Sequence, residues 1–128
     1  MTLARPTILI VDDDESVLEY LRIKLGSRYD VVSTLDSSAV LAMARERRPD
    51  LILCDLDMPG MHGGEVSAAL FADEETRHIP LVFLTATVAP QEIARLKGNV
   101  GGRPALPKSV PLPDLVARIE KMLKASTA

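Results

Sequence analysis

The sequence has few aromatic residues, a single cysteine and little excess charge. Aromatic residues make up 3% of the 128 residues and tryptophan is missing, so any core must be largely aliphatic. The one cysteine, Cys54, excludes an intramolecular disulfide and is typical of a reducing compartment. The net charge of −3 does not indicate electrostatic binding to nucleic acid or to an anionic membrane.

Long apolar segments are also missing from this chain. No run approaches the roughly 20 residues of a membrane-spanning helix, and the first residues contain no apolar stretch of a secretory signal. The length of 128 residues suits one compact domain, and we find no repeat, low-complexity segment or long linker. We therefore expect a cytoplasmic single domain over residues 1–128, with its core over about 7–124 and no membrane contact.

Short aliphatic runs divide the chain, and they are residues 8–11, 29–34, 51–54 and 81–84. Three of them are continuously apolar, which is typical of strands buried on both faces in a parallel sheet. The run at 29–34 is more polar and suits a position nearer an edge. Residues 105–107 are a weaker fifth candidate, and Pro104 and Pro107 restrict this segment to a sheet edge.

Helical patterns with apolar stripes alternate with these runs, over residues 14–25, 37–47, 64–71, 90–97 and 113–124. Gly26 is expected to end the first helix, and Ser37 or Ser38 to cap the second. Strand and helix alternate five times, which predicts an α/β fold with a parallel sheet and helices on both faces. The strand order does not follow from this alternation alone.

Polar residues follow the strands where ligands bind in open parallel sheets, beyond the carboxyl ends. They are Asp12 and Asp13, Asp55 and Asp57, Thr85, and Lys108. Crowded carboxylates are kept ionised by a hard divalent cation such as Mg²⁺, which prefers oxygen ligands. A lysine beside them suits a phosphoryl oxygen. The pattern therefore indicates phosphoryl transfer to or from a carboxylate.

Each of these residues also has a structural interpretation when it is taken alone. The acidic stretch at 12–15 could cap a helix, and Asp55 could belong to the turn around Met-Pro-Gly. Thr85 could be structural and Lys108 a solvated charge. The isolated His62 and His78 are interpreted as surface residues rather than metal ligands. The joint arrangement at four strand ends is what favours a functional site.

The chain resembles response regulator receiver domains in four blocks: ILIVDDDESVLEYL, PDLILCDLDMPGMHG, IPLVFLTA and ALPKSV. Their order and separations match the family from about residue 8 to residue 123. The resemblance implies a flavodoxin-like fold, with a doubly wound five-stranded parallel sheet of order 2-1-3-4-5 and five helices on both faces. It thus supplies the strand order.

The resemblance also implies a role for each site residue, as a two-component signalling domain rather than an enzyme with a separate substrate. Asp55 matches the phosphoacceptor; Asp12 and Asp13 match the pair that holds Mg²⁺, Asp57 a metal ligand through its backbone carbonyl, and Thr85 and Lys108 the groups that contact the phosphoryl group. The implied donor is a sensor histidine kinase or a histidine phosphotransfer protein. The implied output is a switch in binding to a downstream protein, with no direct contact to nucleic acid.

Three positions depart from the family pattern. Ala105 stands where an aromatic residue usually swings inward, so we predict that the usual threonine–aromatic relay is absent. Ser109 replaces the proline that normally follows the lysine in a cis bond. Because a non-proline cis bond costs about 3–4 kcal/mol, we expect a trans Lys108–Ser109 bond or a strained one. His62 replaces a frequently acidic residue, and we expect no consequence beyond local charge.

Two other functions remain open on the sequence. A degenerate receiver that binds partners without phosphorylation is favoured by Ala105 and Ser109, whereas the intact acidic, hydroxyl and lysine positions oppose it. A phosphatase similar to haloacid dehalogenases is suggested by the Asp55-x-Asp57 pair. Met58 and the location of that pair on the third strand rather than the first oppose this second alternative.

Overall fold

The computed structural model describes residues 5–56, 58, 60, 62–86, 99–100 and 103–127. A single sheet of order β2-β1-β3-β4-β6-β5 forms its centre. The strands are β1 (Thr7–Val11), β2 (Asp30–Thr34), β3 (Leu51–Asp55), β4 (Leu81–Thr85), β5 (Asn99–Val100) and β6 (Arg103–Pro107). Five of them are parallel, and with β6 as the fifth they have the predicted order 2-1-3-4-5.

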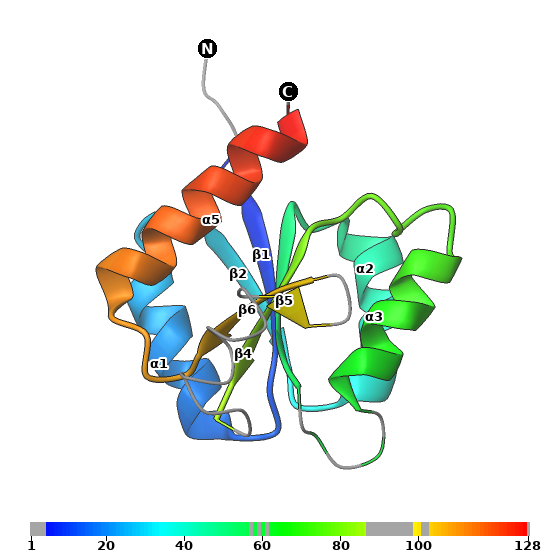
Figure 1. Ribbon diagram of the computed structural model, residues 1–128, viewed down its shortest axis with the longest axis horizontal. Helices are drawn as coiled ribbons and strands as arrows, with labels where there is room; N and C mark the ends of the chain where they lie inside the picture. Colours follow the sequence, from blue (N-terminus) through cyan, green and yellow to red (C-terminus); the bar gives the residue numbers. More distant parts are fainter. Residues whose placement is uncertain are drawn as a thin grey trace.

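The helices of the described residues are α1 (Glu15–Leu25), the 3-10 helix η1 (Ser37–Ala39), α2 (Val40–Arg47), α3 (Gly63–Ala72) and α5 (Leu112–Thr127). Figure 1 shows α1 and α5 on one face of the sheet and α2 and α3 on the other, as predicted for a doubly wound fold. The helix expected at residues 90–97 lies outside the described residues. No helix in the described part of the chain has the length and apolar character to cross a bilayer.

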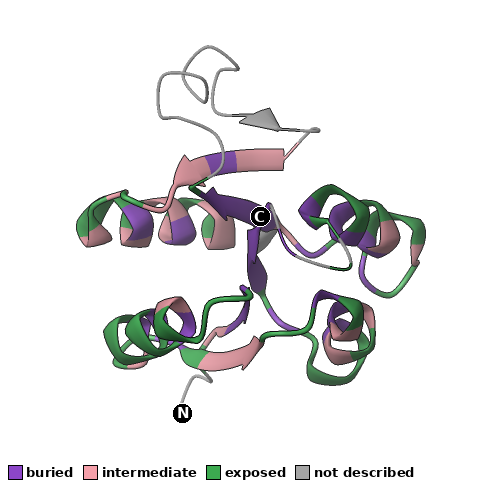
Figure 2. Ribbon diagram, turned by 90° about the horizontal axis from the view of Figure 1, so that it is seen from below, coloured by how far each residue is buried: buried purple, intermediate pink, exposed green. Residues whose placement is uncertain are grey.

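The sheet separates two aliphatic cores because successive side chains of a strand point to opposite faces. Towards α2 and α3 the sheet contributes Leu9, Val11, Ile52, Cys54, Leu81, Phe83 and Ala105. Towards α1 and α5 it contributes Ile8, Ile10, Leu51, Leu53, Val82 and Leu84. Figure 2 shows the central strands buried and the outer helix surfaces exposed. The continuous apolar runs thus serve both cores at once.

The sheet edges follow the prediction in part. β2 lies at one edge, consistent with its polar sequence. At the other edge, the antiparallel β5 was not predicted, and it pairs only with Arg103 and Pro104 of β6. The prediction of an edge strand is therefore wrong for β6 as a whole, although among the described residues its segment 105–107 pairs on the β4 side only.

The helix ends confirm one predicted cap and correct another. Gly26 ends α1, where its backbone N–H donates to the Arg22 carbonyl. The predicted cap at Ser37 or Ser38 is wrong, because the Asp36 carboxylate accepts from the Ser38 backbone N–H at 2.9 Å and starts η1, which leads into α2. An ionised carboxylate is a stronger acceptor than a hydroxyl, and the Ser38 hydroxyl itself donates to Asp36.

Candidate functional site

The register of β1 and β3 brings the predicted carboxylates together. Val11 pairs with Cys54, so the next residues, Asp12 and Asp55, reach the same level at the carboxyl edge of the sheet. Both are buried, with exposed fractions of 2% and 4%, whereas Asp13 is exposed. Carboxylate oxygens of the three residues all lie within 4.8 Å of one another.

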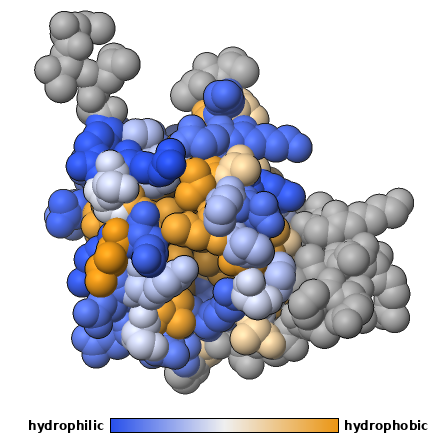
Figure 3. All heavy atoms as spheres, turned by 90° about the vertical axis from the view of Figure 1, so that its left-hand side faces the viewer, coloured by the Kyte–Doolittle hydropathy of each residue, from blue (hydrophilic) through white to orange (hydrophobic). Residues whose placement is uncertain are grey.

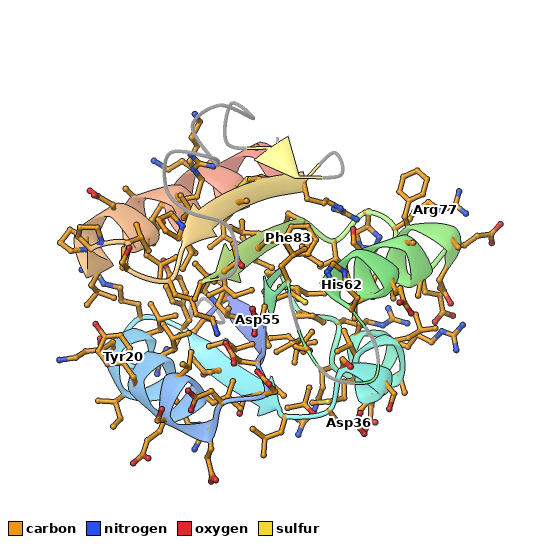
Figure 4. All side chains as sticks on the ribbon, turned by 60° about the horizontal axis from the view of Figure 1, so that its bottom comes forward. Tyr20, Asp36, Asp55, His62, Arg77 and Phe83 are labelled. Carbon is orange, nitrogen blue, oxygen red and sulfur yellow. The ribbon has the colours of Figure 1, made fainter. Side chains whose placement is uncertain are left out.

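Lys108 reaches this cluster from the other side. Thr85 pairs with Pro107 at the end of β4, and the Lys108 backbone N–H donates to the Thr85 carbonyl at 3.0 Å. The Lys108 Nζ atom lies 2.8 Å from Asp12 Oδ2 and 3.3 Å from Asp55 Oδ2. Figure 4 shows Asp55 in the middle of this edge of the molecule. Four strand ends therefore meet, as the sequence predicts.

The ammonium group of Lys108 remains charged in this setting. Burial by itself would lower its pKa, but the hydrogen bond and charge of Asp12, joined by those of Asp55, outweigh burial and raise the pKa above its ordinary value. Among the described residues, the cluster thus contains three carboxylates, and the Lys108 ammonium contacts two of them. The excess of negative charge and the set of hard oxygen donors fit a divalent cation such as Mg²⁺.

The geometry of Asp12 also suits a metal ligand. Its Oδ1 atom accepts from the Asp14 backbone N–H at 2.9 Å, which fixes the orientation of the carboxylate. Among the described residues, no other cluster of three or more His, Cys, Asp or Glu side chains has ligand spacing. Asp57, predicted to contribute its backbone carbonyl, lies outside the described residues.

The start of α3 rests directly on the backbone of Asp55, which the sequence reading missed. The Gly63 N–H donates to the Leu56 carbonyl at 2.8 Å. A Cβ atom at Gly63 would lie 2.6 Å from the Asp55 carbonyl oxygen and 2.8 Å from the Leu56 Cα. Only glycine permits this approach without backbone movement. The adjacent glycines Gly63 and Gly64 were the feature of the sequence that could have indicated this contact.

His62 has a structural role that corrects the prediction of a purely local charge effect. It is exposed, as expected, but it is the N-cap of α3, and its Nδ1 atom accepts from the Gly64 N–H at 3.0 Å. Caps are usually Asp, Asn, Ser or Thr, so an imidazole was not recognised as one. His78 is likewise exposed, beside Arg48 and Asp50 at the amino end of the sheet.

The two other departures from the family pattern, at Ser109 and Ala105, have different outcomes. The described backbone contains no cis peptide bond, so the Lys108–Ser109 bond is trans, as predicted. Ala105 is fully buried and pairs in register with Phe83, two residues before Thr85. The absence of the threonine–aromatic relay stays a prediction.

Cys54 adjoins the site but is not expected to react. It is fully buried, its thiol donates to the Asp55 carbonyl, and burial, reinforced by the charges of Asp55 and Asp12, raises its pKa to about 12. Because the thiolate is the reactive form, we expect the folded protein at about pH 8 to resist alkylation and the urea-unfolded protein to be labelled. Rapid labelling of the folded chain, followed by mass spectrometry, would contradict this.

An apolar groove of about 260 Å³ lies beside Lys108, between α1 and the start of α5. Apolar residues that line it include Val17, Tyr20, Leu21, Leu84 and Leu115. Figure 3 shows the apolar surface between the more polar rims on this face. Apolar surface therefore lies exposed next to the acidic cluster.

Comparison with known proteins identifies the class that this fold and site define. Residues 8–120 match the response regulator receiver domain family, and the chain belongs to that family. The solved structure of the chemotaxis protein CheY4 of Vibrio cholerae superposes with a TM-score of 0.79 at 26% identity, covering 93% of this chain and 99% of that one. A response regulator from Desulfuromonas acetoxidans gives 0.79 at 25% identity, covering 94% and 98%.

Curated relatives are response regulators that are longer than this chain. The response regulator PleD of Caulobacter vibrioides is 49% identical over 80 residues, which is 62% of this chain and 18% of that protein. The DNA-binding response regulator MtrA of Mycolicibacterium smegmatis is 38% identical over 125 residues, which is 97% of this chain and 53% of that protein. The chain thus spans about half, or less, of the length of these relatives.

Proposed function

We propose that this receiver domain accepts a phosphoryl group on Asp55 in a Mg²⁺-dependent reaction and thereby switches its binding to a downstream protein. The observation that carries the proposal is the placement of the Lys108 ammonium, 2.8 Å from Asp12 and 3.3 Å from Asp55, in a largely buried acidic cluster. This cluster already contains one cation, the Lys108 ammonium, and it still has more negative than positive charge among the described residues. Such a site suits a reaction in which a phosphoryl group and a metal ion enter together.

The residues divide the chemistry among them. A carboxylate oxygen of Asp55 forms a bond to phosphorus while the bond from phosphorus to the donor's leaving atom breaks, giving an acyl phosphate. Lys108 is close enough to exchange its contact with Asp55 for one with a phosphoryl oxygen, and the Thr85 hydroxyl would donate to another. Asp12, Asp13 and Asp55 would hold Mg²⁺ together with the Asp57 carbonyl. The metal, when bound, offsets charge on the phosphoryl oxygens.

The partners follow from this chemistry. The donor is a sensor histidine kinase or a histidine phosphotransfer protein, and the domain catalyses only its own phosphorylation and dephosphorylation. The apolar groove beside Lys108 provides surface for such a protein close to the acceptor. The downstream target is a protein that distinguishes the phosphorylated from the unphosphorylated surface.

A second candidate is a degenerate receiver that binds its partner without phosphorylation. The observation that favours it is Ala105, whose small buried side chain leaves β6 without an aromatic group at this position. The intact cluster of Asp12, Asp55 and Lys108 supports a receiver that is phosphorylated over this second candidate.

The proposed function is tested by intact-mass measurement after incubation with Mg²⁺ and acetyl phosphate. We expect the wild type to gain one phosphoryl group and the Asp55→Asn variant to gain none. An Asp50→Asn variant is the matched control, because Asp50 lies at the opposite end of the sheet, where its carboxylate accepts from the Thr7 N–H. An unmodified wild type that also fails to bind Mg²⁺ would favour the degenerate binding module.

A further inference from the structure

We infer that His62 is a positioning residue for phosphoryl acceptance: its imidazole caps the first turn of α3 through Nδ1 and so holds that turn against the backbone of Asp55, and protonation of Nδ1 would release the turn. The functional half of this inference rests on the proposed function. It assigns a role to a residue outside the acidic cluster, and it makes the reaction sensitive to pH through a group that touches neither metal nor phosphoryl.

The cap contact requires an unprotonated ring nitrogen. His62 Nδ1 accepts from the Gly64 N–H at 3.0 Å, while the His62 carbonyl accepts from the backbone N–H groups of Glu65 and Val66 at 2.9 and 3.0 Å. Protonation converts Nδ1 from an acceptor into a donor that faces another donor. It also places a positive charge at a helix N-terminus, where the helix dipole is unfavourable to cations. Both effects act against the cap.

The capped turn is in direct contact with the acceptor strand. Gly63, between His62 and Gly64, donates to the Leu56 carbonyl, and there is no room for a Cβ between it and the Asp55 carbonyl. A shift of this turn therefore displaces the backbone next to the acceptor carboxylate. Further along α3, Val66 and Leu70 are buried in the core, so loss of the cap is expected to loosen the first turn and leave the rest of the helix in place.

Several elements near α3 carry charged groups. They are Asp36 before η1, Arg45, Glu46 and Arg47 on α2, Asp55 on β3, and Arg103 on β6. Arg45 is bound to Asp73 at the far end of α3, and Arg103 donates to Ser67. Glu65 in the first turn of α3 is the nearest acidic residue in sequence to His62.

The cap itself is tested by NMR, without phosphorylation. We expect the Gly64 amide resonance, followed from about pH 8 to about pH 5.5, to shift in parallel with the imidazole signals of His62. In a His62→Asn variant, whose cap does not titrate in this range, the shift should be lost. A His78→Asn variant should retain it, because His78 lies at the opposite end of the sheet. A Gly64 amide that does not follow His62 would overturn the cap.

The positioning role is tested by the initial rate at which the phosphoryl adduct forms from acetyl phosphate in the presence of Mg²⁺. The quantity compared is the rate of the His62→Asn variant divided by that of the wild type, at each pH. We expect the two proteins to agree within about twofold at pH 8 and the variant to be about threefold to fivefold faster at pH 5.5, as loss of one cap allows. A His62→Ala variant should be slow at both values.

Two outcomes would overturn the role. An equal ratio of rates at the two pH values would show that the cap does not position the acceptor. A chain that forms no adduct in any variant would overturn the role together with the proposed function, and the Gly64 titration would distinguish this case by showing the cap intact.

Discussion

A Gly63→Ala variant is expected to lose about 2 kcal/mol of unfolding free energy and to accept the phosphoryl group much more slowly. The added Cβ would lie 2.6 Å from the Asp55 carbonyl oxygen and 2.8 Å from the Leu56 Cα. Both neighbours are backbone atoms, so either α3 or the end of β3 must move. Overpacking of this kind costs about 1–3 kcal/mol, partly offset by the better helix propensity of alanine. Urea unfolding and the acetyl phosphate reaction measure the two effects.

The matched control for the stability of this variant is Gly64→Ala. A Cβ at Gly64 would meet only the His62 imidazole, at 3.3 Å from Nδ1, and an exposed side chain can adjust. We expect its unfolding free energy to stay within about 1 kcal/mol of the wild type. Equal stability and equal reaction rate for Gly63→Ala and the wild type would show that the close approach of α3 to Asp55 has no role.

A Lys108→Met variant is expected to be destabilised in the absence of divalent cations and to form adduct poorly. Removal of the ammonium leaves Asp12 and Asp55 buried without the cation that now contacts both. Breaking a fully buried ion pair costs about 3–5 kcal/mol, and an exposed pair about 0–1. Since the Lys108 side chain is 23% exposed, solvent screening brings the expected loss to about 2 kcal/mol.

Magnesium and pH provide the controls for Lys108. Saturating Mg²⁺ should stabilise the variant more than the wild type, because its cluster has lost its other cation. The pKa of Lys108 is raised above its ordinary value of 10.5, so the contribution is fully present below that pH and is lost as the pH rises through the folded-state pKa. The stability difference should therefore be constant near neutrality and shrink in strong alkali. A Lys108→Met variant as stable as the wild type without Mg²⁺ would contradict this account.

Much of the site could be predicted from sequence because its residues follow continuous apolar runs. Those runs define β1, β3 and β4, and parallel strands present their carboxyl ends at one edge. The residues after them, Asp12, Asp55 and Thr85, meet because β1, β3 and β4 are neighbours in the sheet, an order that the family resemblance supplied. Lys108 depended on the weaker fifth strand, and its ion pairs with both aspartates could not be read from spacing.

The features that sequence reading missed depend on short-range geometry between distant segments. A serine cap was expected before α2. Asp36 instead has the extended backbone of an N-cap residue, and its carboxylate accepts from the Ser38 backbone N–H. The approach of Gly63 to Asp55 requires the exact position of α3 over the end of β3. The two-residue β5 is too short to leave a pattern.

By itself, the sequence determined the α/β class, the aliphatic character of the core and the identity of the residues at the strand ends, because hydrophobic periodicity is a local property that can be read along the chain. The family resemblance added the strand order. Only the tertiary structure decided that Lys108 bridges Asp12 and Asp55, that α3 rests on the backbone of Asp55 and that His62 caps α3. These contacts depend on distances of a few ångströms between separate elements, which are fixed by how the helices pack on the sheet and not by any single segment of the chain.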